Sequence, residues 1–151
     1  MPDSRWHIRR VRRTDFTAVM ALLAASGVPV PPPERATLRR FRQLVADLGT
    51  DLYLASVDGA LVGLVHVTYA RQLAVAPRAR VDQLLVAASH RRRGIGSALL
   101  AFAQGRARQR SCAALVCALP DDAPAAARRL LEKAGLQEHG TQFVRDLSTD
   151  H

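Results

Sequence analysis

The chain has 151 residues, of which 48% are hydrophobic and 23% charged, and its formal net charge at pH 7 is +9. This length fits one globular domain, residues 1–151, with a core of its own. No apolar run is long enough to span a bilayer, and Cys112 and Cys117 lack the spacing of a disulfide framework or a metal site. We therefore expect a cytoplasmic protein with no membrane partner and no bound metal.

Arginine supplies almost all of the positive charge, because Lys133 is the single lysine. Such a charge is compatible with a nucleic-acid or ribosome-binding domain that contacts phosphates through a basic turn. The arginines are scattered, however, and aromatic residues, on which bases would stack, make up only 5% of the chain. We therefore expect no specific nucleic-acid binding and keep this function as an alternative.

The first third of the chain predicts one strand and two helices. The strand is expected at residues 7–13, and the helices at 15–26 and 34–48, with Thr14 or Asp15 capping the first. Prolines crowd the segment 28–33 and exclude a helix there, so the two helices are joined by a stiff loop.

The middle and last thirds predict strands alternating with helices. Asp58-Gly59 tolerates the positive φ angles of a tight turn and predicts a hairpin between strands 52–57 and 60–69. A strand at 80–86 leads to the helix that follows residue 94, and a buried strand is expected at 113–119. The segment 121–124 is expected to begin a helix that Gly135 ends, before a last strand at 142–147.

Residues 84–100 carry the most specific pattern, a strand, an arginine-rich turn and an amphipathic helix opened by glycines. The unpaired amides at a helix N-terminus attract anions, glycine permits close approach, and arginine adds charge-assisted hydrogen bonds. The pattern predicts a pyrophosphate site. Its candidate residues are Arg91, Arg92, Arg93, Gly94, Ile95, Gly96 and Ser97, and the strand before them contributes Leu84, Leu85 and Val86 to the same ligand site.

Two common phosphate-binding loops do not fit this turn. A Walker loop ends in Gly-Lys-Ser/Thr, whereas the only lysine of this chain lies far away. A dinucleotide fingerprint needs a third small residue where this chain has Leu99, and no βαβ unit starts the chain. What remains is the pattern Arg91-x-x-Gly94-x-Gly96.

This pattern resembles the coenzyme A signature, Gln/Arg-x-x-Gly-x-Gly/Ala, of the GNAT superfamily of N-acetyltransferases. The predicted order of elements, β-α-α-β-β-β-α-β-α-β, is similar to that family's order over nearly the whole chain. Residues 12–15, 58–63 and 127–136 also resemble family segments. The resemblance implies an α/β (α+β) fold: a mostly antiparallel mixed sheet with a splayed parallel strand pair and helices on both faces.

The resemblance also implies a reaction, the transfer of the acetyl group of acetyl-CoA to a primary amine by direct attack. The pantetheine arm would lie where strand 80–86 separates from strand 113–119, with the pyrophosphate over residues 91–96. A backbone amide of the splayed strand would stabilise the oxyanion. The acceptor can be a small molecule or a protein, and the last strand could pair across a homodimer.

A few side chains are candidates for proton transfer. Asp82 on the cofactor strand is the first candidate for a general base, and a salt bridge to Arg80 or Arg78 is the alternative role. His66 titrates near neutral pH and could serve, although a strand histidine can equally be packed and hydrogen-bonded. Tyr69 is a weaker candidate for an acid, and so is Tyr53.

The chain departs from the family pattern in its C-terminal block, where Leu131 stands in place of the tyrosine that is the family's common general acid. Leucine cannot donate a proton, so water or another residue must protonate the CoA thiolate, or it leaves unprotonated. The departure keeps a second alternative open: an acyl-CoA-binding protein of the GNAT fold with little catalysis.

Overall fold

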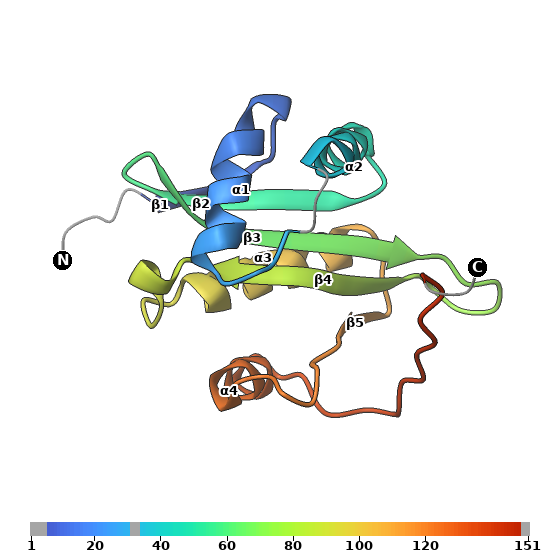
Figure 1. The fold of residues 1–151 in the computed structure, drawn as a ribbon. Coiled ribbons are helices and arrows are strands. Elements are labelled where there is room, and N and C mark those ends of the chain that lie inside the picture. Colours follow the sequence, from blue (N-terminus) through green and yellow to red (C-terminus); the bar gives the residue numbers. More distant parts are fainter. Residues whose placement is uncertain (1–5, 31–33, 149–151) are drawn as a thin grey trace.

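The computed structural model describes residues 6–30 and 34–148, and its centre is a five-stranded sheet of order β1-β2-β3-β4-β5 (Figure 1). Neighbouring strands from β1 to β4 are antiparallel, whereas β4 and β5 are parallel. The predicted mixed, mostly antiparallel sheet is thus confirmed. The strands are β1 (Trp6–Arg10), β2 (Asp51–Val57), β3 (Ala60–Ala70), β4 (Arg78–Val86) and β5 (Ala114–Cys117).

Helices cover both faces of the sheet, as predicted (Figure 1). Buried side chains of α1 and α2 pack on Leu52, Leu54 and Leu64. Side chains of α3 pack on the opposite face, against Val65 and Val67, and Leu131 of α4 joins the same cluster. The helices are α1 (Phe16–Ala25), α2 (Glu34–Ala46), α3 (Ile95–Gln109) and α4 (Ala125–Lys133), with short 3-10 helices η1 (Arg13–Asp15) and η2 (Ala88–His90).

Helix α3 approaches β3 so closely at Gly63 that a side chain there would force its neighbours to shift. A Cβ atom added there would lie 2.9 Å from Cδ1 of Leu99 and 3.3 Å from the carbonyl oxygen of Leu85. Real Cβ contacts are longer than the first of these distances. Gly63 therefore fixes how near the cofactor-side helix lies to the sheet.

Two turns predicted from short motifs are confirmed. Asp58 and Gly59 have φ angles of 50° and 83°, as the β2–β3 hairpin turn requires. Gly135 has a φ angle of 92° and follows α4, while the Leu136 amide donates to the Leu131 carbonyl at 2.9 Å. This is the left-handed end of a helix that glycine favours.

The splayed parallel pair is also present. The β4–β5 ladder begins at Arg78 opposite Ala114 and ends at Val81 opposite Cys117, whereas β4 continues, paired only with β3, to Val86. The β3–β4 register shifts where the ladder ends, since His66 pairs with Gln83 and Val67 with Val81. Asp82 is therefore the extra residue of a β-bulge at the point where β5 departs.

The predicted last strand at 142–147 is wrong. These residues have no regular structure, and Phe143, Val144 and Leu147 are 93%, 82% and 72% exposed. Their composition favours a strand, but a strand needs a partner ladder, and none lies beside this segment in the described part of the chain. The prediction followed local propensity alone.

Other element ends differ from the expected ones. The first strand stops at Arg10 because the next residues turn: the Arg12 amide donates to the Asp15 carboxylate at 2.7 Å, and the Asp15 amide donates back to the Arg12 carbonyl at 2.9 Å. Helix α4 begins only at Ala125, with Pro124 at its cap position and no side-chain cap, so the helix starts after the expected segment 121–124.

The expected loop 28–33 has no regular structure at residues 28–30, and residues 31–33 lie outside the described part. No described helix is long and apolar enough to cross a membrane.

Candidate active site

The N-terminus of α3 presents free backbone amides. Gly94 precedes the helix with φ 81° and ψ 6°, and no side chain caps it. The first amides of a helix have no carbonyl one turn back, so those of Ile95, Gly96 and Ser97 point away from α3 with the positive end of its dipole. The predicted loop thus has a geometry suited to a pyrophosphate.

Three arginines directly precede these amides in the chain. Arg91, Arg92 and Arg93 are all exposed, and Nε of Arg91 donates to the Val86 carbonyl at 3.3 Å, which links the turn to the end of β4. Arg92 has a φ angle of 64°, a conformation that residues with a Cβ rarely adopt. The turn therefore brings three cations to one helix N-terminus under local backbone strain.

A cavity of about 210 Å³ adjoins this helix end. Ser97 and Gln104 of α3 line one side of it, and Lys133 and Ala134 at the end of α4 line the other. Nε2 of Gln104 donates to the Ala134 carbonyl at 3.2 Å and ties the two helices together. The cavity thus has a cation at one wall and continues from the amides of α3.

The β5-facing edge of β4 is open beyond Val81. Leu84, Leu85 and Val86 are half-buried and pair with β3 on their other edge. Asp82 is exposed as a residue although its side chain is only 22% exposed, so the accessible part is largely main chain. Such an edge offers amide and carbonyl groups that an extended ligand can pair with.

His66 lies beside this opening, on the face covered by α1 and α2, because it pairs with Leu52 of that core. The Thr50 hydroxyl donates to the Val67 carbonyl at 2.8 Å and lies 3.1 Å from Nε2 of His66. A hydroxyl has one proton, so Nε2 must donate to Thr50, which leaves Nδ1 as the nitrogen with a free lone pair.

The protonation state of His66 favours a role as a base. Burial lowers the pKa of His66 below its ordinary value of 6.5, and the charge of Arg80 lowers it further. The charges of Asp82 and Asp47 act in the opposite direction without reversing the shift. The imidazole is therefore neutral at pH 7 and can accept a proton.

Asp82 is held by two donors. The Thr68 hydroxyl donates to Oδ2 at 2.5 Å, and Nε of Arg80 donates to Oδ1 at 2.7 Å. The ion pair with Arg80 is the alternative role expected from the sequence. Since both carboxylate oxygens are engaged, Asp82 is placed better to set the electrostatics around His66 than to accept a proton itself.

Tyr69 is not brought to this cluster. It lies on the α3 face of the sheet, where its hydroxyl donates to Oδ2 of Asp51. Burial is the main cause of a strongly raised pKa of Tyr69, and the hydrogen bond to Asp51 adds to it. The Tyr69 hydroxyl is held by a buried carboxylate on the face of the sheet opposite His66. This position does not fit the role of a general acid for the thiolate.

Sequence reasoning missed Thr50 and the buried Asp51, which is 1% exposed. Thr50 fixes the tautomer of His66, and Asp51 accepts hydrogen bonds from Arg106 of α3 and from Arg110, which follows the helix. No motif marks either residue, because their partners lie far away in the chain. Leu131 is 9% exposed within the α3-side core and has no polar role.

A family model, described as the acetyltransferase (GNAT) family, matches residues 16–136. Comparison with curated proteins gives no match. Among solved structures, a ribosomal-protein-alanine N-acetyltransferase from Brucella melitensis has 25% identity and a TM-score of 0.77, over 95% of this chain and 99% of that one.

Two further solved structures share the fold at lower identity. An aminoglycoside N-acetyltransferase in complex with CoA has 18% identity and a TM-score of 0.82, over 97% of this chain and 99% of that one. A glucosamine-6-phosphate N-acetyltransferase from Arabidopsis thaliana has 13% identity and a TM-score of 0.80, over 95% and 99%. With the family model covering most of its length, the chain belongs to the GNAT family of acetyltransferases.

Proposed function

We propose that this acetyltransferase moves the acetyl group of acetyl-CoA to a primary amine, with His66 as the general base. The observation that carries the proposal is the neutral His66 beside the open edge of β4, with its Nδ1 lone pair left free by Thr50. Acetyl-CoA supplies the acetyl group as an activated thioester. This chain's residues bind it, orient it and remove the proton of the amine.

The cofactor's anionic part fits the α3 end of the site. The free amides of Ile95, Gly96 and Ser97 and the three arginines of the turn would hold the pyrophosphate, and Lys133 stands at the adjoining cavity. The open edge of β4 over residues 82–86 would pair with the pantetheine amides and aim one backbone amide at the thioester carbonyl. A solved relative in complex with CoA supports this use of the fold.

The proposed acetyl transfer needs few protein groups. The amine nitrogen attacks the thioester carbonyl carbon, its proton passes to Nδ1 of His66, and the carbon–sulfur bond breaks with its electron pair on the CoA sulfur. Asp82 and Arg80 set the charge around the histidine. Because Leu131 is buried and has no proton to give, the thiolate leaves without a tyrosine donor.

The test is thiol release from acetyl-CoA with a panel of primary amines, with the wild type and His66→Gln compared. Glutamine can still donate to Thr50 but cannot accept the proton, so kcat/KM should fall by about 10²–10⁴. His7→Gln is the matched control: His7 is also a strand histidine with a hydroxyl partner, Ser56 at 3.2 Å, but lies on β1.

Activity that survives His66→Gln, or that falls equally in His7→Gln, would remove His66 from the mechanism. Gly96→Glu tests the cofactor site separately by titration calorimetry, because a carboxylate placed among the α3 amides should abolish acetyl-CoA binding. Tight binding with no thiol release for any amine would instead support an acyl-CoA-binding protein with little catalysis.

A further inference from the structure

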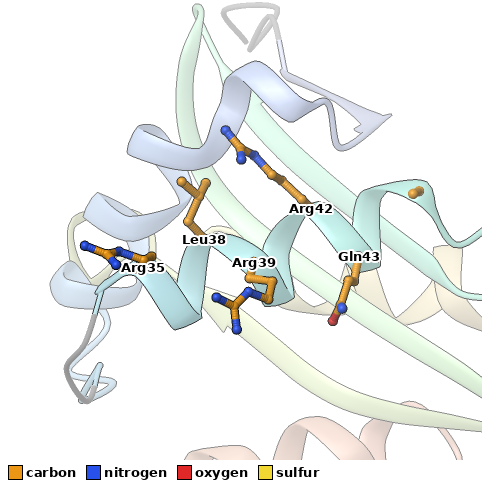
Figure 2. A pocket seen from close by; sticks show the side chains of 6 residues that line it. Arg35, Leu38, Arg39, Arg42 and Gln43 are labelled. Atoms are coloured by element: carbon orange, nitrogen blue, oxygen red, sulfur yellow. The ribbon is translucent and has the colours of Figure 1, made fainter.

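One stripe of α2 carries a concentration of unpaired positive charge. Arg35, Arg39 and Arg42 are all exposed and follow one another at intervals of about one helical turn. In Figure 2, Leu38 and Arg42 extend to one side of the α2 ribbon, and Arg39 and Gln43 extend to the other. The hollow lined by this stripe has a volume of about 420 Å³.

In the part of the chain that the structure describes, these three arginines have no acidic partner, unlike Arg9, Arg80 and Arg106. Within the described residues they take part in no ion pair or side-chain hydrogen bond. By contrast, the Asp15 carboxylate binds Arg9 with two bonds of 2.8 Å. The stripe is therefore a cationic surface whose charge the described part of the chain does not neutralise.

The stripe leads to the candidate base. Ala46, which also lines the hollow, ends α2, and the next residue, Asp47, acts by its charge on the pKa of His66. Thr50, which orients His66, follows in the same loop. A ligand lying along α2 would thus have one end directed toward the proton acceptor.

The shape of this surface decides what kind of ligand fits. From Arg35 to Arg42 the stripe runs about 10 Å along the helix, and every residue lining the hollow comes from α2. A small-molecule pocket is enclosed on several sides, whereas a single helix lines this hollow. No aromatic side chain lines it, so the stacking platform of a single-stranded nucleic acid is missing.

We propose that the Arg35–Arg39–Arg42 stripe binds an acidic segment of a protein acceptor and so directs that acceptor's amine toward His66. This inference rests on the proposed function and names its substrate class. Carboxylates on alternate residues of an extended peptide are spaced by somewhat more than one helical turn, so successive side chains can meet successive arginines. Leu38, between Arg35 and Arg39, and Ala46, beyond Arg42, offer apolar contact to the peptide.

The experiment compares two peptides of equal length, each with a free N-terminal amine and one lysine. One carries glutamate at alternate positions and the other carries glutamine there. At low salt, kcat/KM should be about tenfold higher for the acidic peptide than for the glutamine peptide, because its KM is lower. This preference should shrink as salt screens the exposed charges. Equal rates for the two peptides overturn the inference and leave the proposed function standing.

Single substitutions then locate the effect. Arg35→Ala, Arg39→Ala and Arg42→Ala should each raise KM for the acidic peptide by about two- to fivefold with kcat unchanged. Arg40→Ala is the matched control, because Arg40 is an exposed arginine of the same helix outside the hollow. If Arg40→Ala raises KM equally, the net positive charge of the whole protein, and not the stripe, attracts the acidic peptide.

A binding measurement separates this inference from failure of the catalytic proposal. The acidic peptide with both amines blocked and a fluorescent label cannot react, so its anisotropy reports docking alone. Binding that is weakened in the three stripe variants but not in Arg40→Ala supports the stripe even if no amine is acetylated. Absence of binding overturns the inference. So does displacement of the labelled peptide by polydeoxythymidine more readily than by the unlabelled acidic peptide, because the surface would then prefer a nucleic-acid backbone.

Discussion

Arg106 binds Asp51 with two parallel hydrogen bonds, Nε to Oδ2 at 3.1 Å and Nη2 to Oδ1 at 3.0 Å. Arg110 adds a third bond, at 3.1 Å, to the same Oδ1, and Arg10 approaches it at 3.5 Å from β1. One carboxylate at the start of β2 therefore joins the first strand, the third strand through Tyr69, and the C-terminal turn of α3. The network fixes the end of α3 remote from the cofactor loop.

Asp51→Asn should destabilise the protein by about 3 kcal/mol at pH 7, because several cations lose a buried anion. Burial alone would raise the pKa of Asp51, but hydrogen bonds from Arg106 and Tyr69 outweigh it and the pKa lies below the ordinary 3.8. The carboxylate thus stabilises the fold fully above pH 3.8, and this contribution is lost as pH falls through its lowered pKa.

Urea unfolding at neutral and at strongly acid pH checks this prediction. The difference between wild type and Asp51→Asn should shrink on acidification. Tyr69→Phe, which removes one donor and no charge, should cost only about 1 kcal/mol. A pH-independent difference would mean that packing rather than charge is lost at Asp51.

Asp82→Asn should retain a plateau kcat/KM within about threefold of the wild type if His66 is the base. Removal of the negative charge takes away an influence that raises the pKa of His66, and Arg80, left without its partner, lowers it further. The acid limb of the pH–rate profile should therefore move to lower pH. Loss of activity at every pH would instead identify Asp82 as the base, as first expected from the sequence.

Arg92→Gly should raise stability and weaken cofactor binding at once. Relief of the positive φ angle at Arg92 should contribute about 0.5–1 kcal/mol after the entropy of glycine is counted. Loss of the guanidinium should raise the Kd for acetyl-CoA by about three- to tenfold. Arg93 has no positive φ angle, so Arg93→Ala should weaken acetyl-CoA binding without raising the melting temperature. Calorimetry and thermal unfolding of both variants separate the two effects.

Gly63→Ala should cost about 1–3 kcal/mol, because the added methyl group overlaps Leu99 and meets the backbone carbonyl of Leu85. Gly105→Ala is its control on α3: a Cβ there meets nothing within 4 Å, and alanine should stabilise the helix interior by about 0.5–1 kcal/mol. Denaturant midpoints of the two variants should move in opposite directions. A harmless Gly63→Ala would show that α3 can shift away from β3.

Local chemistry explains why much of the fold could be predicted from the sequence. Positive φ angles at Asp58-Gly59 and Gly135, and the glycines that open α3, are demands of the backbone itself, so a short motif identifies them. The splayed β4–β5 pair came instead from the family resemblance, and the ladder that ends at Val81 confirms it.

What the sequence could not predict depends on contacts between distant residues. Thr50 meets His66 only because β2 and β3 pair in one register, and Asp51 is defined by donors on β1, β3 and α3. The apolar residues at 143–147 failed as a predicted strand for the same reason, since a strand exists only beside a partner.

The splay has a consequence for the dynamics of the sheet. Beyond Val81, the edge of β4 turned away from β3 has no ladder to protect its amides, so solvent can exchange their hydrogens without unfolding the core. A ligand that pairs with this edge would close it and act as the neighbouring strand that β5 no longer supplies. Amide hydrogen exchange at residues 82–86 would then slow on binding. Tighter cofactor binding would therefore protect this part of the sheet more strongly against local opening.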